Sequence, residues 1–232
     1  MTLRIVTQAE RDLRSSLKDD LFPEFLHHDE TVSSFFPTLY ELFPDFQLWV
    51  RDGKRTVAYA CTVPVRWDGV PEERGVDWAA TGGQEGQPTT LCAIVAGVVP
   101  AYRGRGLSTA LLRRMAGLGT AHGLGAMIAP VRPTWKDRYP LVPIDRYVLW
   151  RREDGYHYDP WIRAHERVGG EVLSPAPKSM RVVGSREQWE DWTGLQFPED
   201  GEYVVPGALV PVSFADGIGT YVEPNVWVRH PT

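Results

Sequence analysis

The residues with the clearest chemical signature lie between positions 98 and 109, where the chain reads Val-Val-Pro-Ala-Tyr-Arg-Gly-Arg-Gly-Leu-Ser-Thr. An apolar run ends in this stretch, and a run with helical spacing begins at Leu107. The first turn of a helix exposes backbone N–H groups that lack partners within the helix, together with a partial positive charge. Glycines let an anion approach those groups closely, and the guanidinium groups of Arg103 and Arg105 suit phosphate oxygens. The stretch therefore predicts a site for a ligand that carries a pyrophosphate.

Two common nucleotide-binding motifs do not fit this stretch. The Rossmann fingerprint needs a third glycine where Thr109 stands and opens the first β-α unit of its domain, whereas this unit begins near residue 90. The phosphate loop of nucleotide hydrolases needs Gly-Lys-Ser/Thr after a four-residue gap, and the stretch does not contain it. The pyrophosphate ligand is thus expected to belong to another class.

The elements around the stretch predict a β-α-β unit. Residues 90–99 form a continuous apolar run, typical of a strand buried on both faces. Residues 107–122 carry apolar side chains at helical spacing, and residues 126–131 predict the next strand. A strand, a tight turn, a helix and a further strand in this order indicate a parallel strand pair.

The rest of the chain alternates short strands and helices. Apolar patterning predicts strands at 3–7, 46–51 and 55–66, the last two joined at an Asp-Gly turn, and helices at 9–22 and 161–168. Residues 171–184 read as a strand pair or one interrupted strand, and a capping box at Ser185 opens a helix that runs to about residue 192. Four late strands are expected at 202–205, 208–214, 219–222 and 226–229.

The run Arg103-Gly-Arg-Gly106-Leu-Ser108, preceded by Val98-Val-Pro100, resembles the acyl-CoA site of the GCN5-related N-acetyltransferases. The motif of that family is Gln/Arg-x-x-Gly-x-Gly/Ala, and Ser108 departs from its last position while remaining small. The order of elements is similar to the family's over about residues 3–183. The resemblance implies an α+β fold in α/β/α layers: a mixed, mostly antiparallel twisted sheet with a central parallel β-α-β unit, flanked by helices.

The resemblance also implies a cofactor and a reaction. Acetyl-CoA or another acyl-CoA would bind, and its acyl group would pass directly to a primary amine, expected to belong to a small molecule. Backbone groups matching Val98 and Val99 would pair with the pantetheine arm and polarise the thioester carbonyl. The family motif gives these cofactor-binding residues: Val98, Val99, Arg103, Gly104, Arg105, Gly106, Leu107, Ser108 and Thr109.

Catalysis needs a group that protonates the leaving thiolate of CoA. Many family members use a tyrosine in the helix after the second motif strand, and His165 stands at the matching position of Ala164-His-Glu-Arg-Val-Gly-Gly170. A histidine can carry out this protonation near neutral pH. Tyr158 and Tyr156, just upstream, compete for the role, and a surface position beside Glu166 is the simpler interpretation of His165.

Catalysis also needs a group that removes a proton from the amine. The strand carboxylate that often serves the family is missing from residues 89–99, so Glu41 is the candidate base, with Asp45 and Glu202 as alternatives. Each of the three carboxylates also has a simpler interpretation as a solvated side chain. Two cysteines are too few for a zinc site, and we expect buried free thiols and no bound metal.

Length and composition exclude several classes of protein. The chain has 232 residues, of which 43% are hydrophobic and 24% charged, as in ordinary globular proteins. Its longest apolar run, residues 91–100, is about half of what a membrane-spanning helix needs. With no secretory signal in view, we expect a cytoplasmic protein that does not bind membranes.

We expect one domain over residues 1–232, with insertions at about 67–89 and 133–158 and a β-rich extension from about 184. Residues 132–152 hold six basic and two acidic residues among many aromatics, and could contact an acceptor, the 3′-phosphate of CoA or nucleic acid. The net charge of −5 argues against nucleic acid as a partner. A homodimer is also open, because the late strands could extend a sheet across two subunits.

Two other functions remain open at this point. The missing strand carboxylate would suit a non-catalytic acyl-CoA sensor or accessory protein, and the arginine-rich insertion would suit a nucleic-acid-binding module. The pattern favours an N-acetyltransferase over both. It does not identify the acceptor, the acyl length or the general base.

Overall fold

The structure is a computed structural model that describes residues 3–13 and 21–231. Its nine strands form one sheet in the order β1-β2-β3-β4-β5-β9-β8-β7, and β6 pairs with β9 off this path. The strands are β1 (Leu3–Thr7), β2 (Gln47–Asp52), β3 (Arg55–Val65), β4 (Thr90–Val98), β5 (Ala126–Val131), β6 (Glu171–Ser185), β7 (Gly201–Tyr203), β8 (Val212–Ala215) and β9 (Ile218–Pro231).

The helices connect these strands. The α-helices are α1 (Glu30–Leu42), α2 (Gly75–Ala80), α3 (Leu107–Ala121), α4 (Ile144–Tyr147), α5 (Pro160–Glu166) and α6 (Arg186–Thr193). Single 3₁₀ turns are η2 (Glu24–His28), η3 (Pro44–Phe46), η4 (Gly82–Gln84), η5 (Pro100–Tyr102) and η6 (Lys136–Arg138). In the described part of the chain, no helix has the length and apolar character needed to cross a membrane.

The sheet is mixed, as the sequence predicts. Among the strand pairs, β4–β5 is parallel and the others are antiparallel. Gly53, with φ 57°, makes the predicted turn between β2 and β3. The helix α3 carries the chain from β4 to β5 and completes the β-α-β unit.

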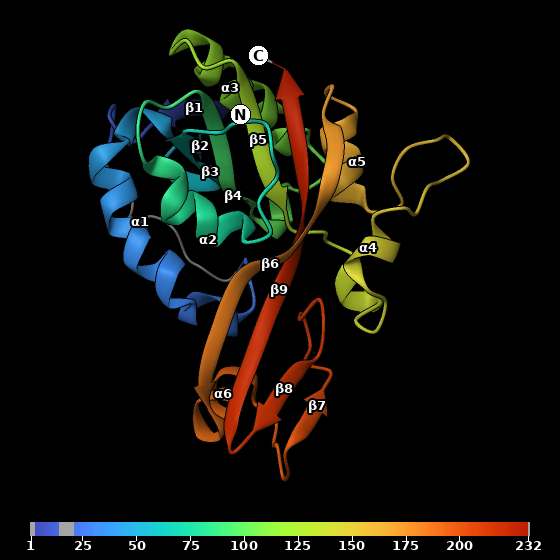
Figure 1. Cartoon of the computed structure of the whole chain (residues 1–232). Helices are drawn as coiled ribbons and strands as arrows, with labels where there is room; N and C mark the ends of the chain where they lie inside the picture. Colours follow the sequence, from blue (N-terminus) through green and yellow to red (C-terminus); the bar gives the residue numbers. More distant parts are fainter. Residues whose placement is uncertain (1–2, 14–20, 232) are drawn as a thin grey trace.

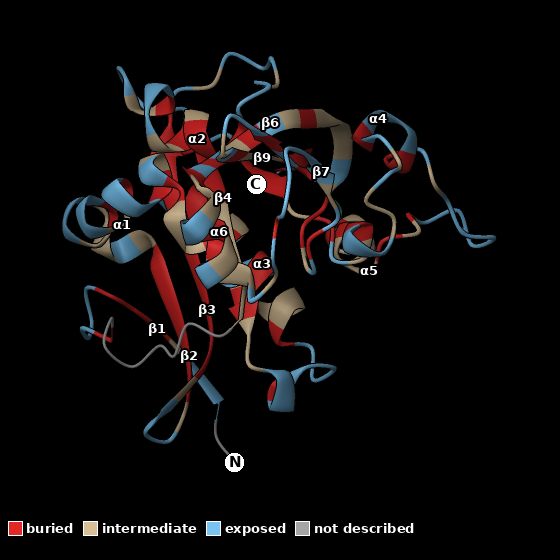
Figure 2. Ribbon diagram, turned by 90° about the horizontal axis from the view of Figure 1, so that it is seen from below, coloured by how far each residue is buried: buried red, intermediate tan, exposed pale blue. Residues whose placement is uncertain are grey.

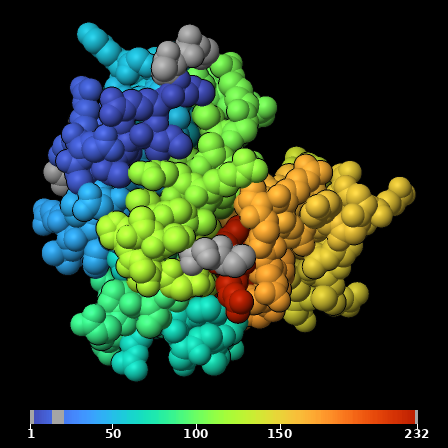
Figure 3. Space-filling view, turned by 90° about the horizontal axis from the view of Figure 1, so that it is seen from above, coloured from blue at the N-terminus to red at the C-terminus, as the bar shows by residue number. Residues whose placement is uncertain are grey.

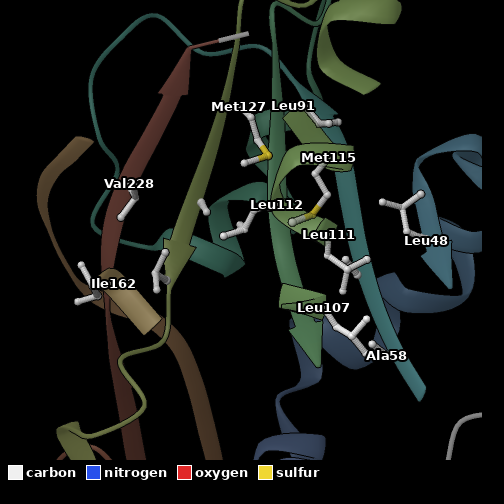
Figure 4. Close-up of a cluster of buried hydrophobic side chains, with 14 of the residues drawn as sticks. Leu48, Ala58, Leu91, Leu107, Leu111, Leu112, Met115, Met127, Ile162 and Val228 are labelled. Atoms are coloured by element: carbon white, nitrogen blue, oxygen red, sulfur yellow. The ribbon is translucent and has the colours of Figure 1, made fainter. Parts of the chain in front are cut away.

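Side chains alternate between the two faces of the sheet and build two cores. Leu91 and Met127 pack with α3 on one face, whereas their neighbours Cys92 and Ile128 pack with α1 and α2 on the other. Figure 4 shows Leu111 and other residues of α3 against the strands, and Ile162 of α5 close to Val228. The α/β/α layers are therefore confirmed, and buried residues follow the strands and the inner sides of the helices (Figure 2).

The long strands β6 and β9 leave the core together and form a second lobe with α6, β7 and β8 (Figure 1). This lobe has its own buried cluster, which includes Phe25 from η2, Trp189 and Phe197. The predicted capping box is present at the start of α6, where Ser185 and Gln188 exchange side-chain and backbone hydrogen bonds.

Three predicted elements differ from the structure. Residues 67–89 are not an open loop, because α2 within them is buried and the backbone N–H of Val76 donates to Oγ of Ser179 at 3.0 Å. The strands predicted at 219–222 and 226–229 are one strand, β9, since its partner β6 has a bulge opposite Pro224. The described ends of the predicted helix 9–22 are not helical, and residues 14–20 lie outside the described residues.

The insertion at 133–158 is a packed segment that holds η6 and α4. Lys136 is fully buried, and its ammonium group donates to the carbonyl oxygens of Tyr139 at 2.9 Å and Leu209 at 2.6 Å. Its aromatic side chains pack on one another, with ring centroids of Tyr139 and Trp150 4.9 Å apart. The lysine therefore ties the insertion to the C-terminal lobe.

We predict that the chain unfolds as one domain, because β6 and β9 run through the main sheet and through the C-terminal lobe. Phe197→Ala would remove a fully buried ring from the lobe and cost about 3–5 kcal/mol. Calorimetry should show one transition that moves to lower temperature as a whole. A separate transition of the lobe alone would instead indicate two domains.

Candidate active site

The central feature of the site is the separation of the parallel strands β4 and β5. They pair at two positions, Leu91 with Met127 and Cys92 with Ile128. Beyond these, β4 continues to Val98 and β5 to Val131 without pairing with each other. A bulge lies at the point of separation, because on the β3 side Ala93 and Val95 are paired and Ile94 between them is not. A bulge bends its strand, and the facing edges are left open to a ligand.

A cleft of about 770 Å³ passes through the sheet at this separation. On one side it is lined by Ser108 and Leu111 of α3 and by Trp161 of α5. On the other side it is lined by Phe36 of α1 and Val76 of α2. Seen from above, the red end of β9 lies between the green segment that holds α3 and the yellow and orange segments that follow α3 in the chain (Figure 3).

The loop before α3 has a backbone that only glycine adopts readily. Gly104 and Gly106 have φ of 74° and 77°, in the left-handed region, and an added Cβ at either would meet no atom within 4 Å. Gly106 is also the N-cap of α3 and provides no side-chain acceptor for the first turn. Residues 103–106 are exposed, so this turn can offer its N–H groups to an anion.

The two arginines of the loop are held by neighbouring groups. Nε of Arg103 donates to the carbonyl oxygen of Val98 at 3.2 Å, and the guanidinium of Arg105 lies 4.8 Å from the ring centre of Tyr102. The hydroxyl of Tyr102 in turn donates to Asp52 at 2.8 Å. The loop is therefore anchored to the β2–β3 hairpin.

The predicted cofactor-binding residues lie together, but Val99 differs from the expectation. Its N–H donates to the carbonyl of Val57 on β3 at 3.0 Å, and its carbonyl accepts from the N–H of Tyr102 at 2.8 Å. The Val99 N–H is thus committed to the sheet and is not available to a pantetheine arm. Val98, Arg103 and Ser108 line the cleft.

His165 lies inside the molecule and lines the cleft, rather than standing on the surface of its helix. Its Nδ1 is 2.9 Å from Nε2 of His230. Burial, together with His230, lowers the pKa of His165 well below its ordinary value, and burial lowers the pKa of His230 to about 4. Both rings are neutral at pH 7, so His165 is not the imidazolium acid that the sequence comparison suggests.

Tyr158 and Glu41 lie outside the lining of the cleft. The hydroxyl of Tyr158 shares a 2.9 Å hydrogen bond with that of Tyr139 within the aromatic insertion. Glu41 is exposed near the end of α1, and the alternatives Asp45 and Glu202 are exposed as well. The tertiary structure therefore brings only His165, of the three predicted proton carriers, to the cleft.

The polar residues of the cleft that sequence reasoning missed include Glu223 and Asn225, which flank Pro224 on β9. Their exposed fractions are 1% and 2%. The available signal was a Glu-Pro-Asn triplet inside an otherwise apolar run, since a charged side chain within a buried strand needs a partner.

Comparison with known proteins agrees with this geometry. Arginine N-acetyltransferase avaD of Aspergillus versicolor is 32% identical over an alignment of 249 residues, gaps included. The alignment covers 91% of this chain and 85% of the relative. The chain belongs to the GCN5-related N-acetyltransferase superfamily. No protein-family model matches the sequence.

Two solved structures share the N-acetyltransferase fold at 15% identity. The loading GNATL domain of CurA from Lyngbya majuscula has a TM-score of 0.61, over 99% of this chain and 96% of that one. The GphF GNAT-like decarboxylase in complex with isobutyryl-CoA has a TM-score of 0.63, over 100% of this chain and 99% of that one. This chain is an N-acetyltransferase, an enzyme that moves an acyl group from coenzyme A to an amine.

We predict opposite effects for two glycine substitutions at α3. Gly106→Ala forces alanine into a left-handed backbone, which costs about 1–2 kcal/mol and moves the N–H groups of the first turn, so the KM for acetyl-CoA should rise. Gly117→Ala on the exposed side of the same helix has room for its Cβ and should stabilise the protein by about 0.5–1 kcal/mol. Thermal unfolding and initial rates test both, and equal effects would contradict the role of the loop.

We also predict a pH dependence of stability from the His165–His230 pair. Their folded-state pKa values lie below the unfolded value of about 6.5, so the unfolded chain binds more protons between pH 6.5 and about 4. The free energy of unfolding therefore falls as pH falls through this window, by up to about 1.4 kcal/mol per pH unit for each proton.

The control for this prediction is the double variant His165→Phe/His230→Leu. Burial raises the pKa of Asp77 to about 7, which gives an opposite slope, but that carboxyl group is present in both proteins and cancels in the comparison. Denaturant unfolding between pH 4.5 and 7.5 should show a flatter profile in the variant. Parallel profiles would contradict the assignment.

Proposed function

We propose that this enzyme acetylates a small, cationic amino acid or a close derivative, with acetyl-CoA as the acyl donor. The observation that carries the proposal is the cleft through the sheet at the separation of β4 and β5, which gives access from both faces. A donor can then enter from the α3 side while an acceptor enters from the α1 and α2 side. The name of the fungal relative supports an arginine-like acceptor.

The residues present fit a coenzyme A thioester. The left-handed loop at Gly104 and Gly106 leaves the N–H groups of the first turn of α3 open for a pyrophosphate, and Arg103 and Arg105 add positive charge. We assign this role to Arg103, Gly104, Arg105, Gly106, Leu107, Ser108 and Thr109. The open edge of β4, up to Val98, would pair with the pantetheine arm.

When bound, the thioester supplies an activated acyl carbon. The nitrogen lone pair of the acceptor attacks that carbon, a C–N bond forms, the C–S bond breaks, and the amine proton leaves while the thiolate gains a proton. The chain contributes by holding both groups in the cleft and by placing backbone donors of β4 where negative charge develops on oxygen. We keep His165 in the proposal as a neutral base that takes the amine proton and not as an imidazolium acid, because it lines the cleft and its Nε2 has no partner among the described residues.

Two finer expectations belong to the same proposal. A cytoplasmic location fits the buried cysteines, Cys61 and Cys92, which form no disulfide within the described residues. A homodimer could form through β7, the last strand in the sheet order, by pairing of strand edges between two copies.

Thermal unfolding with ligands tests the donor site first. Acetyl-CoA at about 100 times its dissociation constant should add about 2.7 kcal/mol and raise the midpoint by about 5–10 °C. Arg103→Ala should lose most of this shift, whereas Arg113→Ala, exposed on the following helix α3, should keep it. An unchanged midpoint with acetyl-CoA and CoA in the wild type would overturn the proposal.

Release of free thiol with a panel of amines then tests transfer. We expect turnover with arginine or a related cationic amine and none without an acceptor. Donor binding without thiol release for any amine would favour a sensor instead.

A further inference from the structure

A second polar site lies where the cleft meets β9, away from the loop before α3. Glu223 and Asn225 line the cleft on either side of Pro224, although both are almost fully buried. The partner strand β6 has its bulge at this point, since Ala176 pairs with Asn225 and Met180 with Glu223. Bulges often re-aim side chains beside active sites, and this one lies between two inward polar groups.

The carboxylate of Glu223 is held by one of its oxygens. Its Oε2 accepts from Nε of Arg132 at 2.9 Å and from the hydroxyl of Tyr221 at 3.0 Å. Arg132 is itself fixed, because its Nη2 donates to the carbonyl of Gly207 at 2.6 Å. The other oxygen, Oε1, is buried and has no hydrogen-bond partner among the described residues. A fixed carboxylate with one unused oxygen at the wall of a cleft is a preorganised acceptor.

The side chain of Asn225 is oriented in a similar way. Its Nδ2 donates to the carbonyl of Pro130 on β5 at 3.1 Å, and this contact fixes which end of the amide is the oxygen. The Oδ1 that remains is buried and has no partner among the described residues. The site thus offers two unused oxygens and calls for a ligand rich in N–H donors.

Charged side chains of both signs line the cleft around the site. Arg132 and Glu223 form an ion pair, and Asp137, which also lines the cleft, adds a negative charge that acts on Arg132. Arg138 lines the cleft as well, but its guanidinium is stacked over Trp135, 4.6 Å from the ring centre, and would face an anionic group of the same ligand. An amino acid with a cationic end and a carboxylate would match both the acidic residues and Arg138.

We propose that Glu223 and Asn225 bind the guanidinium group of the acceptor and determine specificity, with Arg132 as the residue that positions Glu223. A guanidinium carries five N–H donors in a planar fork and can reach oxygens on two neighbouring side chains at once. This inference rests on the proposed N-acetyltransferase function and names its acceptor chemistry.

The test compares arginine with citrulline, which has the same length but a neutral urea group. Calorimetry with the enzyme saturated with CoA, and steady-state kinetics with acetyl-CoA, should both favour arginine by at least about tenfold. Glu223→Gln can keep an oxygen toward Arg132 and Tyr221 while it replaces Oε1 by an amide donor. This variant should lose the preference through the KM for arginine, with the dissociation constant of CoA unchanged.

Two further variants keep the test independent of folding. Asn225→Ala removes the second oxygen without touching the ion pair and should also reduce the preference. Glu171→Gln, exposed at the start of β6, is the matched control and should behave like the wild type. Thermal unfolding and CoA binding verify that each variant is folded, and the wild-type comparison of arginine with citrulline needs no variant.

Three outcomes would overturn the inference: equal binding of arginine and citrulline by the wild type, a preference for lysine over arginine, or a preference unchanged in folded Glu223→Gln and Asn225→Ala. Failure of the proposed function would look different, since no amine would then release thiol from acetyl-CoA. Turnover without preference for a guanidinium would therefore reject the acceptor subsite alone.

Discussion

Two parallel strands that pair at only two positions and then separate create the constraint on which the rest of this enzyme depends. Backbone groups at a strand edge require partners, and an edge inside a sheet has no access to bulk solvent unless a cleft reaches it. Past the bulge at Ile94, the edge of β4 up to Val98 faces the cleft instead of a neighbouring strand. The same separation places residues from both faces of the sheet, such as Leu111 and Phe36, around one cleft.

The last strand, β9, compensates for that opening. It pairs with β5 along residues 226–231, and so gives β5 a continuous partner on the edge that β4 does not use. It also pairs with β6 over almost its whole length and joins the core to the C-terminal lobe. Because β9 also carries Glu223, Asn225 and His230, the stability of the sheet and the shape of this part of the cleft depend on the same backbone.

Burial of polar groups distinguishes the two ends of the cleft. The loop before α3 is exposed and offers backbone N–H groups and arginine side chains, which would suit a large, highly charged ligand that must also leave. The part of the cleft beside β9 is buried and has fixed side chains, since Arg132 bonds to one oxygen of Glu223 and the carbonyl of Pro130 orients Asn225. An unsatisfied buried acceptor is costly, so such a site discriminates strongly by hydrogen-bond chemistry.

Local sequence determined the parts of this protein that local physics controls. Short-range steric and hydrophobic rules specify a strand from the apolar run at 90–99, a left-handed turn from the glycines at 104 and 106, and a helix from the spacing that begins at Leu107. The hairpin at Gly53 and the capping box at Ser185 follow from the same kind of rule.

Only the tertiary structure decided which distant residues share the cleft. The sequence offers His165 as a proton carrier or as a surface residue of its helix, but burial and packing against His230, 65 positions along the chain, place it in the cleft wall and keep it neutral. Glu41 had the right chemistry but lies on the exposed side of α1. Glu223 and Asn225 gained their place because β9 returns beside β5 with a bulged partner, and strand register between segments so far apart is set by global packing and not by neighbours in sequence.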